Sequence, residues 1–258
     1  MDLYGDYIAQ TGDRRASLAA RMRPRKLEDI RGQDEILGPG KLLTRLIASN
    51  RLFSAIFFGP PGTGKTSVAR LIGAKSDFFF ATVSAVTSNT ARVKKIISQA
   101  RERIALSGNA TVVFVDEFHR FNRPQQEILL PHIEDGIIGF LGLTTSNPFH
   151  SMAPALLSRS HLFQFRPLTD GAVISILERA LADRENGLGS EPVELKEEPL
   201  TLLARLSEGD ARRALNNLEL AVLTTPPGKN GTILLTPEII SETVRKKICR
   251  YDRDGDQH

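Results

Sequence analysis

The sequence predicts an α/β fold in which a five-stranded parallel sheet is followed by a small all-helical domain. Between about residues 55 and 166, short apolar and β-branched runs alternate with helical patterns, as expected for parallel strands joined by crossover helices. The runs are almost continuously apolar, which is typical of strands that helices cover on both faces. After Pro167 the strand patterns stop and four helical patterns follow.

The elements are expected in a fixed alternating order along the chain. Strands are predicted at Ala55–Phe58, Phe78–Ser84, Thr111–Val115, Phe140–Thr145 and His161–Phe165. Helices between them are predicted at Lys65–Gly73, Thr90–Leu106 and Pro124–Glu134, and Pro131 is expected to kink or shorten the last one. Later helices are predicted at Asp170–Asn186, Glu198–Leu206, Asp210–Leu223 and Pro237–Ile248. This divides the chain into an N-terminal arm (1–20), a core (21–167), a helical domain (168–250) and the start of a truncated C-terminal region (251–258).

Composition places the chain among soluble proteins. Of its 258 residues, 41% are hydrophobic and 25% are charged, which suffices for a sizeable core. The longest apolar runs are far shorter than the roughly 20 residues of a membrane span, and the N-terminus lacks the pattern of a secretory signal. We therefore expect a cytoplasmic protein with no membrane partner, associated with the nucleoid if bacterial. The single cysteine, Cys249, excludes an intrachain disulfide and a cysteine-based zinc site.

A glycine-rich segment follows the first predicted strand and opens the first predicted helix. It matches G-x-x-x-x-G-K-[ST], a P-loop whose backbone N–H groups and helix N-terminus face phosphate oxygens. Its lysine neutralises phosphate charge, and its final hydroxyl residue reaches Mg²⁺. The sequence therefore predicts binding of ATP with Mg²⁺. The residues of this segment are Gly59, Pro60, Pro61, Gly62, Thr63, Gly64, Lys65 and Thr66.

Two acids, Asp116 and Glu117, end the third predicted strand. Ligands bind at the carboxyl edge of a parallel sheet, so both carboxylates are expected beside the P-loop. Asp116 would join Thr66 in holding Mg²⁺, and Glu117 would orient and deprotonate the attacking water. A strand ending in Asp-Glu is also compatible with ordinary solvation, but its combination with a P-loop favours ATP hydrolysis.

Two further polar residues follow the fourth strand. Asn147 would arrive beside the acids and help to position the water, although an Asn before Pro148 is also a common turn former. Arg159 lies on the connection to the last strand, where it would serve a neighbouring subunit's site or remain a solvated surface residue.

Basic residues are concentrated rather than spread evenly. The net charge of +4 suits a polyanionic partner without establishing one. Within the predicted helix Thr90–Leu106, the cluster Arg92, Lys94 and Lys95 is either a solvated face or part of a DNA-binding surface. A second basic run, between Arg14 and Lys26, extends from the N-terminal arm into the start of the core.

Several motifs together form a recognisable combination. Besides the P-loop, they are Arg23-Pro24 with Gly32-Gln33, Asp116–Asn122, Thr145–Pro148, Leu157–Arg159 and Gly209–Asn216. This set resembles the clamp-loader branch of AAA+ ATPases. Within that branch, Gln125-Gln126, Leu130–Gly136 and Ser84–Thr87 are similar to the RarA/MgsA family of replication-associated recombination proteins, relatives of the eukaryotic Werner helicase-interacting protein.

The resemblance implies a P-loop AAA+ core with a helical lid, and DNA-dependent ATP hydrolysis at subunit interfaces. It further implies work on single-stranded or forked DNA in replication-fork maintenance, recombination and repair, with replication proteins as additional partners. By position, Asn147 would be sensor 1, Arg159 an arginine finger acting in trans and Arg212 sensor 2, while Ile30, Arg31 and Gly32 would border the adenine. Family members continue into tetramer-forming regions, so we expect a homo-oligomeric intact protein and a monomeric or weakly associating fragment here.

Three rival interpretations remain. A clamp-loader subunit is the nearest, but the chain lacks the four cysteines of the zinc module in the bacterial motor subunit. A Holliday-junction branch-migration motor would carry a winged-helix domain after the lid, and none begins before His258. A scaffold that binds ATP without hydrolysing it would usually have lost Lys65, Asp116 or Glu117, and all three are present.

Overall fold

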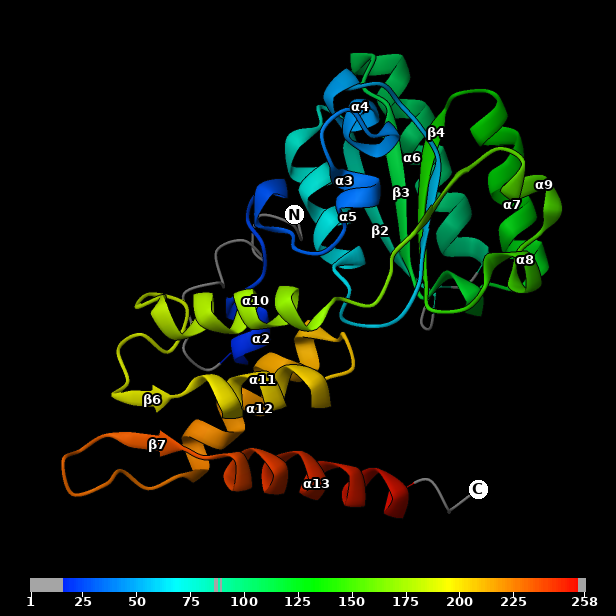
Figure 1. Ribbon diagram of the computed structural model, residues 1–258. Coiled ribbons are helices and arrows are strands. Elements are labelled where there is room, and N and C mark those ends of the chain that lie inside the picture. The colour runs from blue at the N-terminus through cyan, green and yellow to red at the C-terminus, as the bar shows by residue number, and fades with distance from the viewer. Residues whose placement is uncertain (1–15, 86–87, 89, 255–258) are drawn as a thin grey trace. The chain divides into compact units, whose positions relative to one another are not determined.

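The five predicted strands form one parallel sheet in the computed structural model, which describes residues 16–85, 88 and 90–254 (Figure 1). The strand order is β2-β3-β4-β1-β5. The strands are β1 (Ala55–Phe58), β2 (Phe79–Ser84), β3 (Thr111–Asp116), β4 (Ile138–Thr144) and β5 (His161–Gln164). Phe58 pairs with Thr144, and Val115 pairs with Gly142, so the carboxyl ends of β1, β3 and β4 lie together at one edge. This is the edge at which the sequence places its candidate site.

Helices cover both faces of this sheet because its strands alternate apolar side chains between two clusters. Phe57 and Phe114 pack in one cluster with residues of α4 and α5, whereas Ile56 and Val113 pack in the other with residues of α6, α7 and α9. The helices of the first layer are α3 (Asp34–Leu37), α4 (Leu42–Ser49) and α5 (Lys65–Lys75). Those of the second are α6 (Thr90–Ser107), α7 (Arg123–Glu134) and α9 (Pro154–Leu157). The buried strands are thus covered on both sides, as their composition predicted.

Helix α7 begins with a capping box and ends where the sequence predicts. The Asn122 side chain accepts from the N–H of Gln125, whose own side chain accepts from the N–H of Asn122, each at 3.0 Å. Satisfying two N-terminal groups in this way fixes the start of a helix. The helix continues through Pro131 to Glu134, so the proline does not shorten it.

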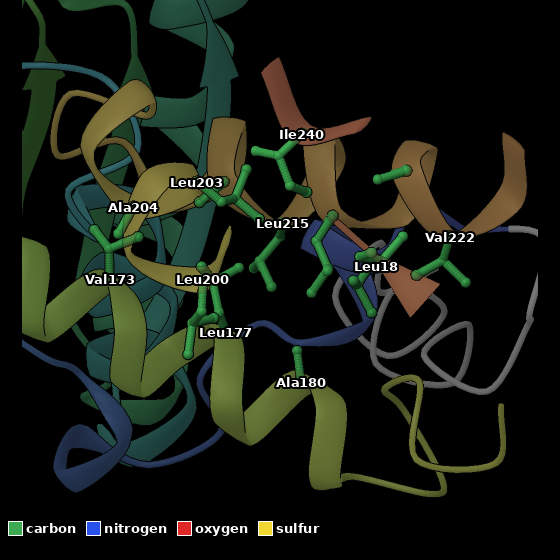
Figure 2. Close-up of a cluster of buried hydrophobic side chains, with 14 of the residues drawn as sticks. Leu18, Val173, Leu177, Ala180, Leu200, Leu203, Ala204, Leu215, Val222 and Ile240 are labelled. Atoms are coloured by element: carbon green, nitrogen blue, oxygen red, sulfur yellow. The ribbon is translucent and has the colours of Figure 1, made fainter. Parts of the chain in front are cut away.

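The second compact unit is helical and has its own core (Figure 2). It contains α2 (Leu18–Arg21), α10 (Asp170–Ala182), α11 (Glu197–Leu206), α12 (Ala211–Thr224) and α13 (Pro237–Asp254). Leu18 and Met22 are buried in that core, and Arg21 forms a 3.0 Å ion pair with Glu219. The described residues up to Pro24 therefore belong with the helical unit, which starts at Pro167, and the unit that contains the five-stranded sheet spans Arg25–Arg166. The predicted boundaries at residues 21 and 168 need this correction, because two apolar side chains in a basic arm are too weak a signal.

A short ladder also distinguishes the helical unit from the purely helical domain expected. Its strands, β6 (Val193–Leu195) and β7 (Ile233–Leu235), pair in parallel. Three residues are too few to show an alternating pattern, so no periodicity in the sequence indicates these strands.

Parts of the predictions lie outside the described residues. They are residues 1–15 of the arm, Val86 and Thr87 of the family motif, and residues 255–258. Among the helices that are described, none has both the length and the apolar character required to cross a bilayer.

Candidate nucleotide-binding and hydrolysis site

The loop between β1 and α5 is built from glycines in conformations that other residues avoid. Gly59, Gly62 and Gly64 have φ values of 138°, 67° and 99°. At Gly59, an added Cβ atom would lie 2.1 Å from the carbonyl oxygen of Phe165, at the end of β5. The loop therefore wraps closely against the sheet, and glycines in such conformations allow backbone N–H groups to turn toward an anion, as in other phosphate-binding loops.

Replacing Gly59 with Ala is expected to lower the free energy of unfolding by ~2 kcal/mol or more and to abolish nucleotide binding. Strained backbone alone costs about 1–3 kcal/mol, and the contact with Phe165 adds to it. Thermal unfolding and fluorescent-nucleotide titration measure the two effects.

The matched control is Gly136→Ala. Gly136 has a φ of 67°, but nothing lies within 4 Å of its added Cβ. It should show the conformational cost alone and retain nucleotide binding. Equal behaviour of the two variants would contradict the steric argument.

Lys65 is the first residue of α5 and is buried, with 7% of its surface exposed. Its ammonium group donates to the carbonyl oxygens of Gly59 at 2.7 Å and Pro60 at 2.6 Å. A buried charge requires such partners, and an anionic phosphate would satisfy the ammonium better than neutral carbonyls. The Thr66 side chain follows on the first turn, half-buried. The donor set of this loop thus fits the β- and γ-phosphates of ATP.

The two acids stand at the exposed end of β3. Asp116 accepts from the N–H of Glu117 at 3.0 Å, and Glu117 adopts a left-handed backbone with φ 52° and ψ 42°. This conformation is uncommon for a residue with a side chain and turns Glu117 away from the strand direction. The Glu117 carboxylate pairs with the Arg120 guanidinium at 2.9 Å, and both groups are about half exposed. The Asp116 carboxylate therefore lies at the end of β3, while the Glu117 carboxylate is held next to it by Arg120.

A hydrogen bond joins the segment that follows the acids to the end of β4. The His119 Nδ1 atom lies 3.2 Å from the hydroxyl of Thr144, which in turn accepts from the N–H of Ser146 at 3.0 Å. Asn147 follows, and its side-chain oxygen accepts from the N–H of Phe149 at 3.0 Å, which caps α8 (Pro148–Ser151). Asn147 therefore caps α8, and its role in positioning the attacking water stays a prediction.

The residues predicted to border adenine lie before α3. Ile30 is close to the P-loop, since its methyl groups lie 3.8 and 3.9 Å from a Cβ added at Gly64. Arg31 and Gly32 are exposed, and Gly32 has a φ of 71°. The buried Gln33 side chain next to them donates to the carbonyl oxygens of Thr63 at 3.3 Å and Arg166 at 2.8 Å. Gln33 therefore holds this segment to the P-loop.

Arg159 and Arg212 lie in different units. Arg159, which follows α9, is exposed and forms an ion pair with Glu134 at the end of α7. Arg212 is exposed on the first turn of α12, where Asp210 caps the helix by accepting from the N–H of Arg213 at 2.9 Å. The finger and sensor 2 roles of these arginines remain predictions.

Helix α6 divides its basic cluster between two sides. At about 100° per residue, Arg92 and Lys95 share one side, whereas Lys94 points more than a quarter turn away. All three are exposed, and Val93, Ile96 and Ile97 are buried beneath them as predicted. Lys94 instead lines a groove of about 420 Å³ between α6 and α7, together with Arg101 and His132.

Sequence reasoning missed four residues that organise this site. Gln33, His119, Arg120 and Glu134 each contact a predicted residue or its segment. All four lie within the motifs that carry the family resemblance, and this was the one feature of the sequence that could have indicated them. Their partners are distant in sequence or depend on backbone geometry, and neither is visible in a residue pattern.

The chain matches two protein families. Residues 55–168 match the ATPase family associated with various cellular activities (AAA), and residues 189–258 match the AAA C-terminal domain. The first match contains the P-loop, both acids, Asn147 and Arg159. Together, the two matches support an AAA ATPase core followed by an AAA C-terminal domain.

Curated relatives are similar over nearly the whole chain. Replication-associated recombination protein A of Escherichia coli K12 is 40% identical over 240 residues, covering 93% of this chain and 54% of that protein. The protein of the same name in Bacillus subtilis is 39% identical over 241 residues, covering 93% and 56%. The chain thus spans about half the length of these relatives.

Solved structures support the fold. The Thermotoga maritima RuvB Holliday junction branch migration motor superposes with a TM-score of 0.67 at 22% identity, covering 87% of this chain and 72% of that one. A mutant of the same protein gives a TM-score of 0.68 at 22% identity, covering 88% and 73%. At this identity, the likeness concerns the fold alone.

Proposed function

Because the chain belongs to the RarA/MgsA family of replication-associated recombination proteins, we propose that it is the ATPase region of a DNA-dependent motor for replication-fork maintenance, recombination and DNA repair. The observation that carries this is the meeting of three strand ends. The P-loop follows β1, the acids end β3, and Asn147 follows β4, which lies between the other two. Separate segments thus supply phosphate binding, a base and a polar orienting group at one edge.

In this proposal, the chain's own groups bind the nucleotide and activate water. The P-loop N–H groups and Lys65 hold the phosphates, and Glu117 accepts the proton of the attacking water while the Asn147 amide orients that water. When bound, Mg²⁺ supplies charge neutralisation at the phosphates, and Thr66 and Asp116 are the residues that would hold it. Ile30, Arg31 and Gly32 border the adenine.

The carboxylate of Glu117 must be available for this role. Its partner Arg120 is more than half exposed, and exposed pairs of this kind contribute only about 0–1 kcal/mol. The ion pair with Arg120 therefore costs little free energy to break when the Glu117 carboxylate turns toward the attacking water.

Complete turnover requires a second subunit. Arg159 would act on the nucleotide of a neighbouring chain as an arginine finger, and Arg212 would sense the γ-phosphate as sensor 2. The intact protein would be a homo-oligomer in the cytoplasm, whereas this chain would be monomeric or weakly associated at low concentration. Its partners would be single-stranded or forked DNA, and replication proteins.

The decisive assay measures ATP hydrolysis by the purified chain with and without single-stranded and forked DNA. Stimulation by DNA supports the proposal. Hydrolysis that DNA leaves unchanged would contradict DNA dependence, and stimulation only by a sliding clamp or by four-way junctions would favour a clamp-loader subunit or a branch-migration motor. ATP binding without turnover under every condition would indicate a scaffold.

Replacing Arg92, Lys94 and Lys95 together with Ala is expected to weaken DNA binding across sequences. Each lost phosphate contact also reduces the slope of log affinity against log salt, by about 0.7 to 0.9. Fluorescence anisotropy at a series of salt concentrations measures both effects. Because Lys94 lies apart on α6, the double variant of Arg92 and Lys95 should retain most of the effect.

The matched control removes three exposed charges elsewhere in the same unit, Lys41, Arg45 and Arg51. It should change affinity less than the α6 variant. If both triple variants lost affinity equally, the effect would reflect net charge and not a DNA-binding surface.

A further inference from the structure

The segment that carries Arg159 is fastened to α7 by one buried side chain. Gln126 is 1% exposed, and its side-chain oxygen accepts from the N–H of Ala153 at 2.8 Å. Its amide nitrogen donates to the carbonyl oxygens of Ser151 at 3.2 Å and Phe121 at 3.0 Å. Both ends of the amide are thus satisfied by backbone groups, and Ala153 directly precedes α9. Hydrogen bonds of this kind are costly to leave unmade, so α9 has a defined place against α7.

Apolar packing supports the same attachment. Met152 and Leu156, which lie on the segment Ser151–Arg159 that carries the predicted finger, are buried in one cluster with Leu129 of α7. Close-packed interiors resist displacement, because moving one side chain opens a void or creates an overlap. The backbone that leads to Arg159 is therefore held by polar and apolar contacts together.

A second contact acts on the arginine itself. The guanidinium forms an ion pair with Glu134 through one terminal nitrogen. The other donates to the carbonyl oxygen of Ala155 at 2.8 Å and the hydroxyl of Ser158 at 3.1 Å. A planar guanidinium held on two sides has little freedom to rotate.

Stability does not explain why an acid occupies position 134. Glu134 is the last residue of α7, where a negative charge opposes the helix dipole by about 0.3–1 kcal/mol. Its pair with Arg159 has side chains 49% and 39% exposed, and such pairs contribute little to folding. The ion pair with Glu134 instead determines how the Arg159 guanidinium is oriented.

We propose that Gln126 and Glu134 are positioning residues for the arginine finger: Gln126 fixes α9 against α7, and Glu134 orients the Arg159 guanidinium toward a neighbouring subunit. This rests on the proposed action of Arg159 in trans. Both residues therefore act on the partner's site and not on the site of their own chain. A residue that only stabilised the fold would affect both sites, whereas a positioning residue affects the partner's site alone.

The test uses two chains that are inactive alone. An Arg159→Ala chain has a complete site but no finger and is the acceptor; a Glu117→Gln chain has a finger but no base and is the donor. Mixing them yields activity only where a donor finger meets an acceptor site. Adding Glu134→Ala to the donor should lower the regained kcat about tenfold, as misplacement of a reacting group does. Adding it to the acceptor should change kcat less than about twofold, because the acceptor's own finger is already absent.

Two further variants accompany it. Glu134→Gln in the donor keeps a hydrogen-bond acceptor and should recover part of the kcat lost in Glu134→Ala, with KM for ATP unchanged. Gln126→Met in the donor should also lower kcat selectively, and the Glu134 variants keep the test valid if this one fails to fold.

The outcomes distinguish the two ideas. An active parent mixture with equal losses in donor and acceptor, no loss in either, or a gain in the donor would refute the positioning role while leaving the finger intact. A parent mixture without activity would refute the trans finger, and the positioning role with it.

Discussion

A Glu117→Gln chain is expected to bind ATP as tightly as the parent and to lose turnover by about 10²–10⁴-fold, the usual contribution of a positioned general base. The amide keeps the shape of the side chain but cannot accept the proton of the attacking water. Steady-state kinetics at saturating ATP and calorimetric binding measure the two effects. The Glu117 carboxylate pairs with Arg120 and is expected to act on water and not on phosphate, so binding should be unaffected.

The contrasting variant is Lys65→Ala. It removes the buried ammonium that contacts the Gly59 and Pro60 carbonyls, and it should abolish nucleotide binding itself. If Glu117→Gln retained the parental rate, the assignment of Glu117 as base would be wrong. If Lys65→Ala still bound ATP at parental affinity, the P-loop would not be the nucleotide site.

Replacing Arg159 with Ala is expected to lower kcat by about 10³-fold or more at protein concentrations where chains associate, since arginine fingers contribute about 10³–10⁵. The parent's specific activity should rise with protein concentration, because each site needs a neighbour. Mixing with Glu117→Gln chains should restore activity in proportion to the mixed interfaces. Hydrolysis followed across a concentration series, with sedimentation analysis of the same samples, measures both.

Arg120→Ala is a suitable control, because it also removes an exposed arginine near the site. It should not be rescued by Glu117→Gln chains in the same way, since Arg120 contacts the base of its own chain. Normal hydrolysis by the Arg159→Ala chain alone, at concentrations where it self-associates, would make Arg159 a structural or DNA-facing residue.

The sequence by itself determined the sheet, the nucleotide loop and the identity of the central acids. Short, near-continuous apolar runs that alternate with helical patterns predict strands covered on both faces, and the lysine and glycines of the P-loop predict a phosphate site in that position. Glu117 and Asp116 were predicted from their place at a strand end. The prediction of the sheet is confirmed, because it depends on residues adjacent in the chain, whereas the roles of Lys65, Asp116 and Glu117 stay predictions.

The tertiary structure decided what depends on distant partners. It assigned Leu18 and Met22 to the helical unit, paired the short strands β6 and β7, and separated Lys94 from Arg92 and Lys95. It also brought Glu134 to Arg159 and His119 to Thr144, residues 25 positions apart in each case. Chain reversal through α7, β4 and α9 creates these contacts, and no local spacing records them. The physical reason is that side-chain pairing across elements follows from packing, whereas periodicity reports only which face of one element is buried.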